Sequence, residues 1–165
     1  MEEPLIISNT TPLINFAEIE RLDVLEAVFG RILIPPGVVD ELQAKSALFS
    51  KAAVVPSKSN ISIMAPIDQL LVRGLASRLH QGEAECLALA MEHPGALLLI
   101  DDLAARDFAA SNGLLYIGTL GCLAEAKKQG LIPALKPVLT ELRSKARFWI
   151  SDRLAERVLR ENNEW

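Results

Sequence analysis

The sequence predicts an α/β fold in three α/β/α layers, with a central, mainly parallel sheet of about four to five strands. Short apolar runs alternate along the chain with helical patterns. The runs are apolar throughout, as in Leu5-Ile6-Ile7 and Leu97-Leu98-Leu99-Ile100, which is typical of parallel strands covered on both faces. Half of the 165 residues are apolar, so residues 1–165 suit a single domain with one core.

The first part of the chain predicts two buried strands, each followed by a helix. A strand at Leu5–Ser8 precedes a helix that Thr10 or Thr11 caps, with Pro12 in its first turn. The elements expected next are a helix at 22–29 stopped by Gly30, a strand at 31–34, a helix from Pro36 to about Phe49, and a loop at 51–66 with an edge strand at 61–64.

The second part of the chain continues the alternation of helices and strands. Expected are a helix at 67–79, a buried helix at 83–92 opened by Gly82, a strand at 96–100, a helix at 103–112 ended by Gly113, a strand at 115–117, and a helix at 120–129 capped by Gly130. Two amphipathic helices, 134–146 and about 152–161, pack on the domain or form an oligomer contact. Leu154, Val158 and Leu159 are spaced for one helix face, which favours a homodimer.

Composition limits which partners and which cellular compartment we expect for this protein. The net charge of −4 predicts no strong overall attraction to nucleic acid. Cys86 and Cys122 fall among small and apolar residues, so we expect buried thiols. No apolar run approaches the roughly 20 residues that span a bilayer, and the acidic N-terminus is unlike a secretory signal. We therefore expect a cytoplasmic protein with no membrane contact.

Acidic and amide side chains stand where a parallel fold brings them to one edge of the sheet. Asn9 and the pair Asp101-Asp102 each follow an apolar strand, while Glu41, Glu83 and Glu85 lie in helices. Ligands bind at the carboxyl ends of parallel strands. Several carboxylates meeting there form a site for a hard divalent cation such as Mg²⁺ or Mn²⁺.

Each of these side chains also has a structural interpretation. Glu83 can favour a helix N-terminus, Glu41 can be a solvated helix residue, and one member of the Asp101-Asp102 pair can cap the next helix. Glu85 differs, because its helix is expected to be buried and a buried carboxylate needs a partner or a metal.

The chain resembles a PIN domain, in a small prokaryotic subgroup of nucleic-acid-binding proteins of unknown function. The resemblance covers about residues 4–150. The matching segments, in family order, are Ile7-Ser8-Asn9-Thr10-Thr11-Pro12-Leu13-Ile14, Ile34-Pro35-Pro36-Gly37-Val38-Val39-Asp40-Glu41-Leu42, Gly82-Glu83-Ala84-Glu85, Leu98-Leu99-Ile100-Asp101-Asp102, Ala105-Arg106 and Ile117-Gly118-Thr119-Leu120-Gly121.

This resemblance implies a ribonuclease that depends on Mg²⁺ or Mn²⁺ and acts on RNA; many relatives are toxins paired with an antitoxin protein. By position, Asn9, Glu41, Glu85 and Asp102 would form the catalytic and metal-binding set, with Glu83 as an extra ligand. Asp101 would lie outside the ligand shell or exchange roles with Asp102. The supporting residues would be Thr11 and Thr119, which orient ligands or water, and Arg106, which contacts RNA.

Asn9 departs from the family pattern, since catalytic PIN domains typically carry an aspartate there. An amide oxygen can ligate Mg²⁺ but adds no charge. The alternative is therefore a catalytically weak module that binds nucleic acid or protein, and a metal-dependent phosphatase would suit the same carboxylates. Other candidates for RNA contact are Lys127, Lys128, Arg143, Lys145 and Arg147, whereas Trp149 and Trp165 are expected to pack or to dimerise.

Overall fold

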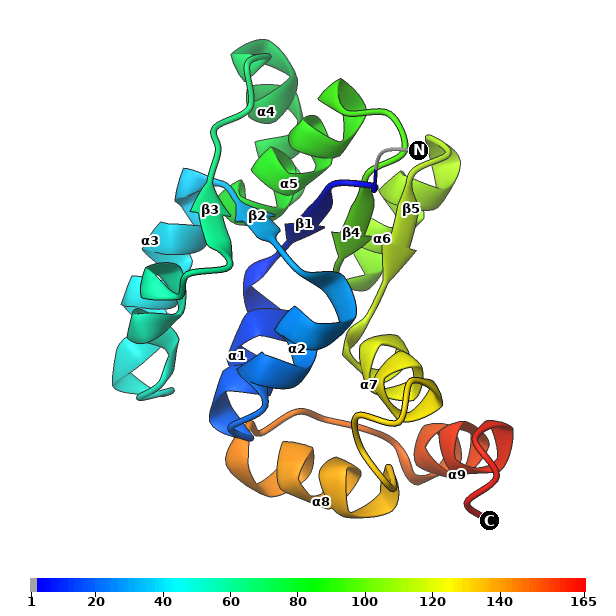
Figure 1. Cartoon of the computed structure of the whole chain (residues 1–165). Helices are drawn as coiled ribbons and strands as arrows, with labels where there is room; N and C mark the ends of the chain where they lie inside the picture. Colours follow the sequence, from blue (N-terminus) through cyan, green and yellow to red (C-terminus); the bar gives the residue numbers. More distant parts are fainter. Residues whose placement is uncertain (1–2) are drawn as a thin grey trace.

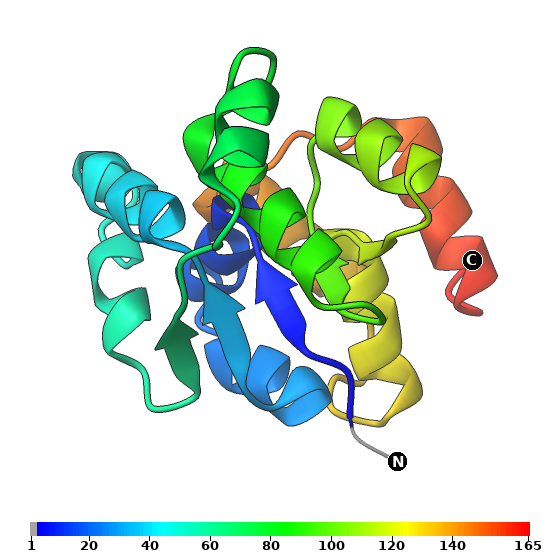
Figure 2. The same ribbon diagram turned by 90° about the horizontal axis from the view of Figure 1, so that it is seen from above.

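A five-stranded parallel sheet forms the centre of the molecule. The computed structural model describes residues 3–165, so Met1 and Glu2 of the expected domain lie outside it. The strands lie in the order β3-β2-β1-β4-β5, and Figure 2 shows neighbouring arrows pointing the same way. Their bounds are β1 Ile6–Ser8, β2 Ile32–Ile34, β3 Ile61–Ile63, β4 Leu97–Leu99 and β5 Leu115–Ile117. The predicted three-layer α/β/α class is confirmed.

Helices cover both faces of this sheet (Figure 1). α4 and α5 lie on one side, while α1, α2 and α7 lie on the other, with α8 beyond them. The helices are α1 Thr10–Glu18, α2 Leu22–Phe29, α3 Pro36–Ala44, α4 Gln69–Ala76, α5 Gln81–Glu92, α6 Leu103–Ser111, α7 Thr119–Lys128, α8 Lys136–Lys145 and α9 Asp152–Glu161, with 3₁₀ turns at Lys45–Ala47 and Ala52–Ser57.

The strand register brings the polar residues to one edge. Ser8 pairs with Leu99, and Leu99 with Ile117. Three neighbouring strands therefore end level with one another, and the residues that follow them share the carboxyl edge of the sheet. The backbone N–H of Asn9 donates to Leu99 at 3.0 Å, which fixes Asn9 at the end of β1.

One apolar core includes the C-terminal helices. Phe16 and Leu87 are fully buried against the sheet, and Leu142 of α8 and Leu159 of α9 belong to the same core. Burying such a side chain contributes about 1.5–3 kcal/mol. The apolar face of α9 that suggested a homodimer is therefore used within the chain, where Val158 is buried too.

Three local expectations are wrong. The helix from Pro36 ends at Ala44, because the chain tightens into a 3₁₀ turn instead of running on to Phe49. The expected loop at 51–66 contains the 3₁₀ helix Ala52–Ser57, which turns its buried side chains toward the core. Neither threonine caps α1, since the cap position belongs to Asn9.

The expectation that both thiols are buried agrees with the structure. Cys86 and Cys122 are free and buried, and burial raises the pKa of both thiols above the ordinary value. None of the helices within residues 3–165 is long and apolar enough to cross a bilayer.

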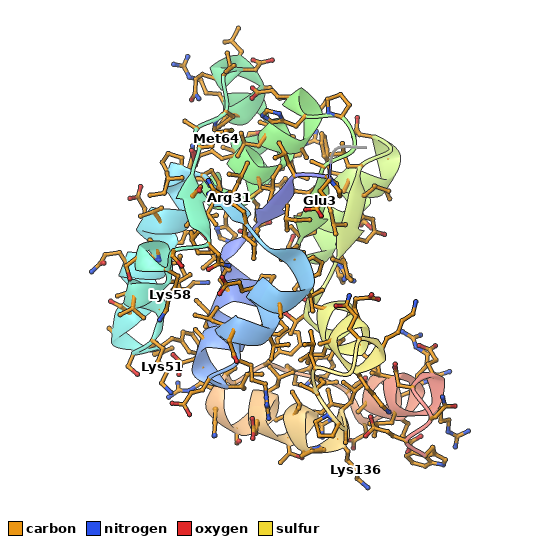
Figure 3. All side chains as sticks on the ribbon, in the orientation of Figure 1. Glu3, Arg31, Lys51, Lys58, Met64 and Lys136 are labelled. Carbon is orange, nitrogen blue, oxygen red and sulfur yellow. The ribbon has the colours of Figure 1, made fainter. Side chains whose placement is uncertain are left out.

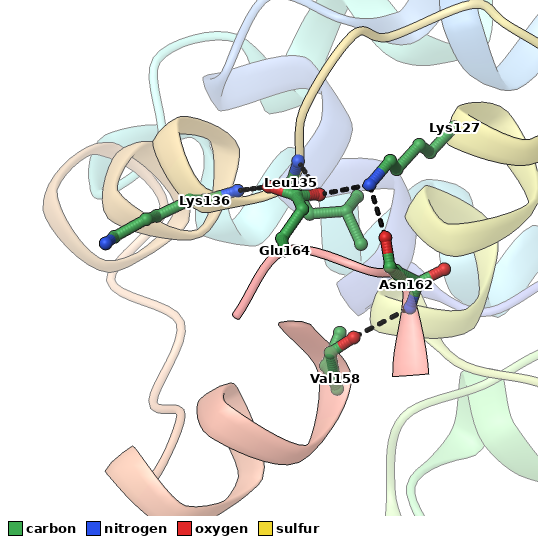
Figure 4. Close-up of polar contacts among 6 residues, drawn as sticks. All are labelled: Lys127, Leu135, Lys136, Val158, Asn162 and Glu164. Atoms are coloured by element: carbon green, nitrogen blue, oxygen red, sulfur yellow. Dashed lines mark hydrogen bonds and ion pairs between the residues drawn. The ribbon is translucent and has the colours of Figure 1, made fainter. Parts of the chain in front are cut away.

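The C-terminus is held on the domain by one carboxylate (Figure 4). Glu164 accepts hydrogen bonds from the Lys127 ammonium at 2.8 Å and from the backbone N–H groups of Leu135 at 2.6 Å and Lys136 at 3.0 Å. Burial disfavours its charge, but these donors outweigh burial and lower its pKa below the ordinary 4.5. Glu164 thus links α7, the start of α8 and the end of the chain.

We expect Glu164→Gln to lower the free energy of unfolding at neutral pH by about 1–2 kcal/mol, because charge-assisted hydrogen bonds are lost. A lowered folded pKa stabilises the fold above the unfolded value of 4.5 and ceases to do so as the pH falls through the folded value. The difference from wild type, measured by urea unfolding, should therefore shrink in acid. The control is Glu161→Gln, whose exposed pair with Arg157 at 3.9 Å should contribute little.

Candidate metal centre

Two glutamates lock the N-terminal turns of α3 and α5 together. Glu85 of α5 accepts a hydrogen bond from the backbone N–H of Gly37 in α3 at 2.9 Å. In return, Glu41 of α3 accepts from the backbone N–H of Gly82 in α5 at 3.1 Å. These N–H groups have no partner within their own helices, and the helix dipole favours a negative charge beside them. We call this pair of contacts the reciprocal clasp.

Both donors of the clasp are glycines for a steric reason. A Cβ on Gly37 would lie 2.1 Å from Oε2 of Glu85, and a Cβ on Gly82 would lie 2.7 Å from Oε1 of Glu41. Any side chain at either position would displace the carboxylate that the backbone holds. The clasp therefore requires glycine in both helices.

A threonine hydroxyl holds the second oxygen of Glu41. Thr10 is buried and donates to Oε2 of Glu41 at 2.5 Å. The sequence had suggested Thr11 as the supporting hydroxyl, but its neighbour Thr10 makes this contact. Both oxygens of Glu41 are thus fixed, one by α1 and one by α5.

Glu83 lies on the other side of α5 from Glu85, facing α6. Burial, and then the nearby carboxylates of Asp102 and Glu41, raise the pKa of Glu83 to about 7. Asp102 caps α6 by accepting from the backbone N–H of Ala105 at 3.0 Å, as one member of the aspartate pair was expected to do. Glu83 thus lies near Asp102 and Glu41, and Glu41 lies near Glu85, so these four carboxylates are neighbours at the edge.

Asp101 is committed to a different partner. Its oxygens accept from the backbone N–H of Thr119 at 2.8 Å and from the Thr119 hydroxyl at 2.6 Å. The Asn15 amide donates to the same hydroxyl at 3.0 Å. Burial raises the pKa of Asp101 in spite of these bonds. Asp101 therefore anchors the start of α7, and sequence reasoning missed Asn15, whose helical spacing carries no signal.

Arg106 is held within the domain. Its Nε donates to the Ile100 carbonyl at 3.0 Å, and its guanidinium lies 5.4 Å from the ring centroid of Tyr116. Its Nη2 lies so close to Gly118 that a Cβ there would meet it at 2.2 Å. These contacts tie α6 to the ends of β4 and β5. RNA contact by Arg106 stays a prediction.

Asn9 leaves a buried acceptor without a donor. Its side chain is 4 % exposed, yet Oδ1 accepts no hydrogen bond from any residue that the structure describes. An asparagine at a helix N-cap usually accepts from the first turn, and Asn9 does not. An unpaired buried acceptor lowers the stability of the fold by about 1–3 kcal/mol. A ligand that bound to this oxygen would remove that cost.

The donor chemistry of this edge fits a hard divalent cation. All the candidates are oxygens, and within residues 3–165 no ion pair involves Glu41, Glu83, Glu85, Asp101 or Asp102. Burial raises the pKa of Glu85 as well, and Asp40 and Glu41 add to the shift. No three His, Cys, Asp or Glu side chains of the described chain are gathered closely enough to hold an ion. The oxygens are thus of the kind that a hard divalent cation binds.

Comparison with known protein families identifies the family to which this protein belongs. A family model described as a PIN domain matches residues 5–164, nearly the whole chain. The chain therefore belongs to the PIN-domain family, and the resemblance noted in the sequence is confirmed. No curated protein sequence matches it.

We expect Gly37→Ala to lower the free energy of unfolding by about 1–3 kcal/mol, because the new methyl group must displace Glu85 from its backbone donor. Urea unfolding measures the loss. The control is Gly74→Ala in α4, where a Cβ meets nothing within 4 Å and a helical alanine should stabilise by about 0.5–1 kcal/mol. A loss no larger than that of a surface substitution would contradict the clasp.

Without added metal, the free energy of unfolding should fall as the pH rises from about 4.5 to about 7. The raised pKa means that folded Glu83 holds its proton more tightly than the unfolded chain does, so ionisation favours unfolding. Glu83→Gln should lessen this fall by about 1–2 kcal/mol. Urea unfolding in EDTA at about pH 5 and about pH 8 measures the effect; the exposed Glu156→Gln should leave it as in wild type.

Proposed function

We propose that this protein is a metal-dependent ribonuclease that hydrolyses phosphodiester bonds with Mg²⁺ or Mn²⁺. The observation that carries the proposal is a group of neighbouring carboxylates at the carboxyl edge, none of which forms an ion pair within residues 3–165. The buried, unpaired Oδ1 of Asn9 follows a strand that ends at the same edge. Membership of the PIN-domain family supports a nuclease-like function.

The cation would be held by the carboxylates of Glu41, Glu85 and Asp102 and by the side-chain amide oxygen of Asn9. When bound, the cation lowers the pKa of water and stabilises negative charge on the phosphate. The reciprocal clasp keeps Glu41 and Glu85 in place before any ligand arrives, so little side-chain entropy is lost on binding. Thr10 fixes the remaining freedom of Glu41.

Glu83 is suited to proton handling. With a pKa of about 7, its carboxyl group carries a proton about half of the time near neutral pH. A group poised in this way can give a proton to a leaving oxygen or take one from water. Its neighbours Asp102 and Glu41 supply the repulsion that, after burial, sets this pKa.

The second candidate is a catalytically weak module that binds nucleic acid or protein. Asn9 favours it, because a neutral amide replaces the carboxylate expected at this position and lowers the charge available to a cation. The two candidates differ in whether RNA is cut.

Cleavage of a mixed single-stranded RNA in Mg²⁺ or Mn²⁺ separates the two candidates. We expect Glu85→Gln and Asp102→Asn to reduce cleavage by more than about 100-fold, since changes in the residues around metal ligands already cost about 10–100-fold. Asp107→Asn, which changes an exposed carboxylate on the helix that Asp102 caps, should cleave like wild type. Absence of cleavage with either metal would favour the binding module.

Asn9→Asp should strengthen Mn²⁺ binding by at least about tenfold, which is about 1.4 kcal/mol, because it adds a charge to the site. Isothermal titration calorimetry measures the dissociation constant. Unchanged affinity would show that Asn9 is not a ligand.

A further inference from the structure

One C-terminal segment differs in charge from the rest of the molecule. Residues 143–160 hold six Lys or Arg side chains and two carboxylates, whereas the other 147 residues hold eleven Lys or Arg side chains and nineteen carboxylates. The net charge of −4 therefore conceals a basic segment on an acidic protein. Among the described residues, neither Arg147 nor Arg153 forms an ion pair.

The turn between α8 and α9 presents a tryptophan to solvent. Trp149 is 82 % exposed, so of the two roles expected from the sequence, packing or dimerisation, packing within the chain is wrong. The residues on either side are fixed. The backbone N–H of Phe148 donates to Leu142 at 3.0 Å, and Arg143 donates to the carbonyl of the buried Ile150 at 2.8 Å. Trp149 is thus held outward on a clamped turn.

Arg147 occupies a backbone position that favours glycine. Its φ of 54° lies in the left-handed region, directly after the end of α8. Glu20 and Asn163 end their helices in the same way. Glycine would adopt this conformation without strain, and an arginine here keeps a positive charge two residues before the exposed indole.

We propose that Arg147, Trp149, Arg153 and Arg157 form a binding surface for single-stranded RNA, which we call the basic corner. Arg153 and Arg157 are one helical turn apart and share a face of α9. Guanidinium groups neutralise phosphates, and an exposed indole stacks on a base that is not paired in a duplex. The inference rests on the proposed ribonuclease function and adds a surface that holds its substrate.

The position of the basic corner suits this role. In Figure 2 the strands point upward, and the segment joining α8 to α9 crosses the same upper side of the molecule. A strand of RNA bound there lies on the side where the carboxyl edge opens. The acidic edge repels phosphate, so a separate basic surface supplies the attraction that the site lacks.

Binding can be measured apart from cleavage. The probe is a fluorescein-labelled single-stranded RNA of about 20 nucleotides, with full-length protein in EDTA and anisotropy as the readout. Trp149→Ala should weaken binding about five- to hundredfold through loss of stacking. The control is Lys58→Gln, an exposed lysine on the opposite side of the molecule from α9 (Figure 3), which should bind like wild type.

Arg147→Gly distinguishes a binding role from a structural one. It should raise the melting temperature by about 2–4 °C, because glycine relieves the left-handed conformation. It should also weaken RNA binding and reduce the salt slope by about 0.7 for the lost phosphate contact. A structural arginine would show no change in RNA binding.

Trp149 reports on stacking directly. Because the chain has two tryptophans, Trp165→Phe leaves Trp149 as the sole indole, and single-stranded RNA should quench its fluorescence. Equal binding of duplex RNA or polyglutamate would overturn the proposal in favour of a general polyanion surface or an acidic protein partner. Unchanged RNA binding by the Trp149→Ala protein would overturn the proposal too. If the wild-type protein binds single-stranded RNA but does not cleave it, only the proposed ribonuclease function is overturned.

Discussion

The reciprocal clasp between α3 and α5 is the constraint on which the site depends. Each helix offers a backbone N–H at its N-terminus and a carboxylate one turn or so further on, and each carboxylate accepts from the other helix. Charge-assisted bonds of this kind are about twice as strong as neutral ones. They hold Glu41 and Glu85 at the starts of the helices that adjoin the carboxyl edge, where Glu85 is buried and Glu41 half-buried. Thr10, Glu83 and Asp102 are arranged around this pair.

The clasp leaves the negative charge of the edge without a balancing positive charge. Backbone N–H groups orient Glu41 and Glu85, but they do not neutralise the negative charge of the four neighbouring carboxylates. The remaining repulsion, added to burial, raises the pKa of Glu83 to about 7. The apolar core formed by the sheet and the helices stabilises the fold and offsets this repulsion. A divalent cation would relieve the charge, and it would give Asn9 Oδ1 the partner that it lacks.

The sheet, and the edge at which the candidate residues lie, could be predicted from the sequence, whereas the contacts of these residues could not. Continuous apolar runs gave the parallel strands, and the residues after them were expected at one edge. The choice of Thr10 over Thr11 depends on where α1 begins, and one residue turns the hydroxyl by about 100°. The donors of the clasp lie 48 and 41 residues from their acceptors, so no local pattern indicates them. The exposure of Trp149 depends likewise on how α8 and α9 pack.

The central claim is that the clasped carboxylates and Asn9 form one cation site. Anomalous scattering from a crystal of the full-length protein soaked in Mn²⁺ tests it most directly, because the ion is located without reference to activity. The account predicts an anomalous peak at the carboxyl edge, with Asn9, Glu41, Glu85 and Asp102 as its nearest oxygens. A crystal that binds Mn²⁺ elsewhere, with no peak at this edge, would contradict it.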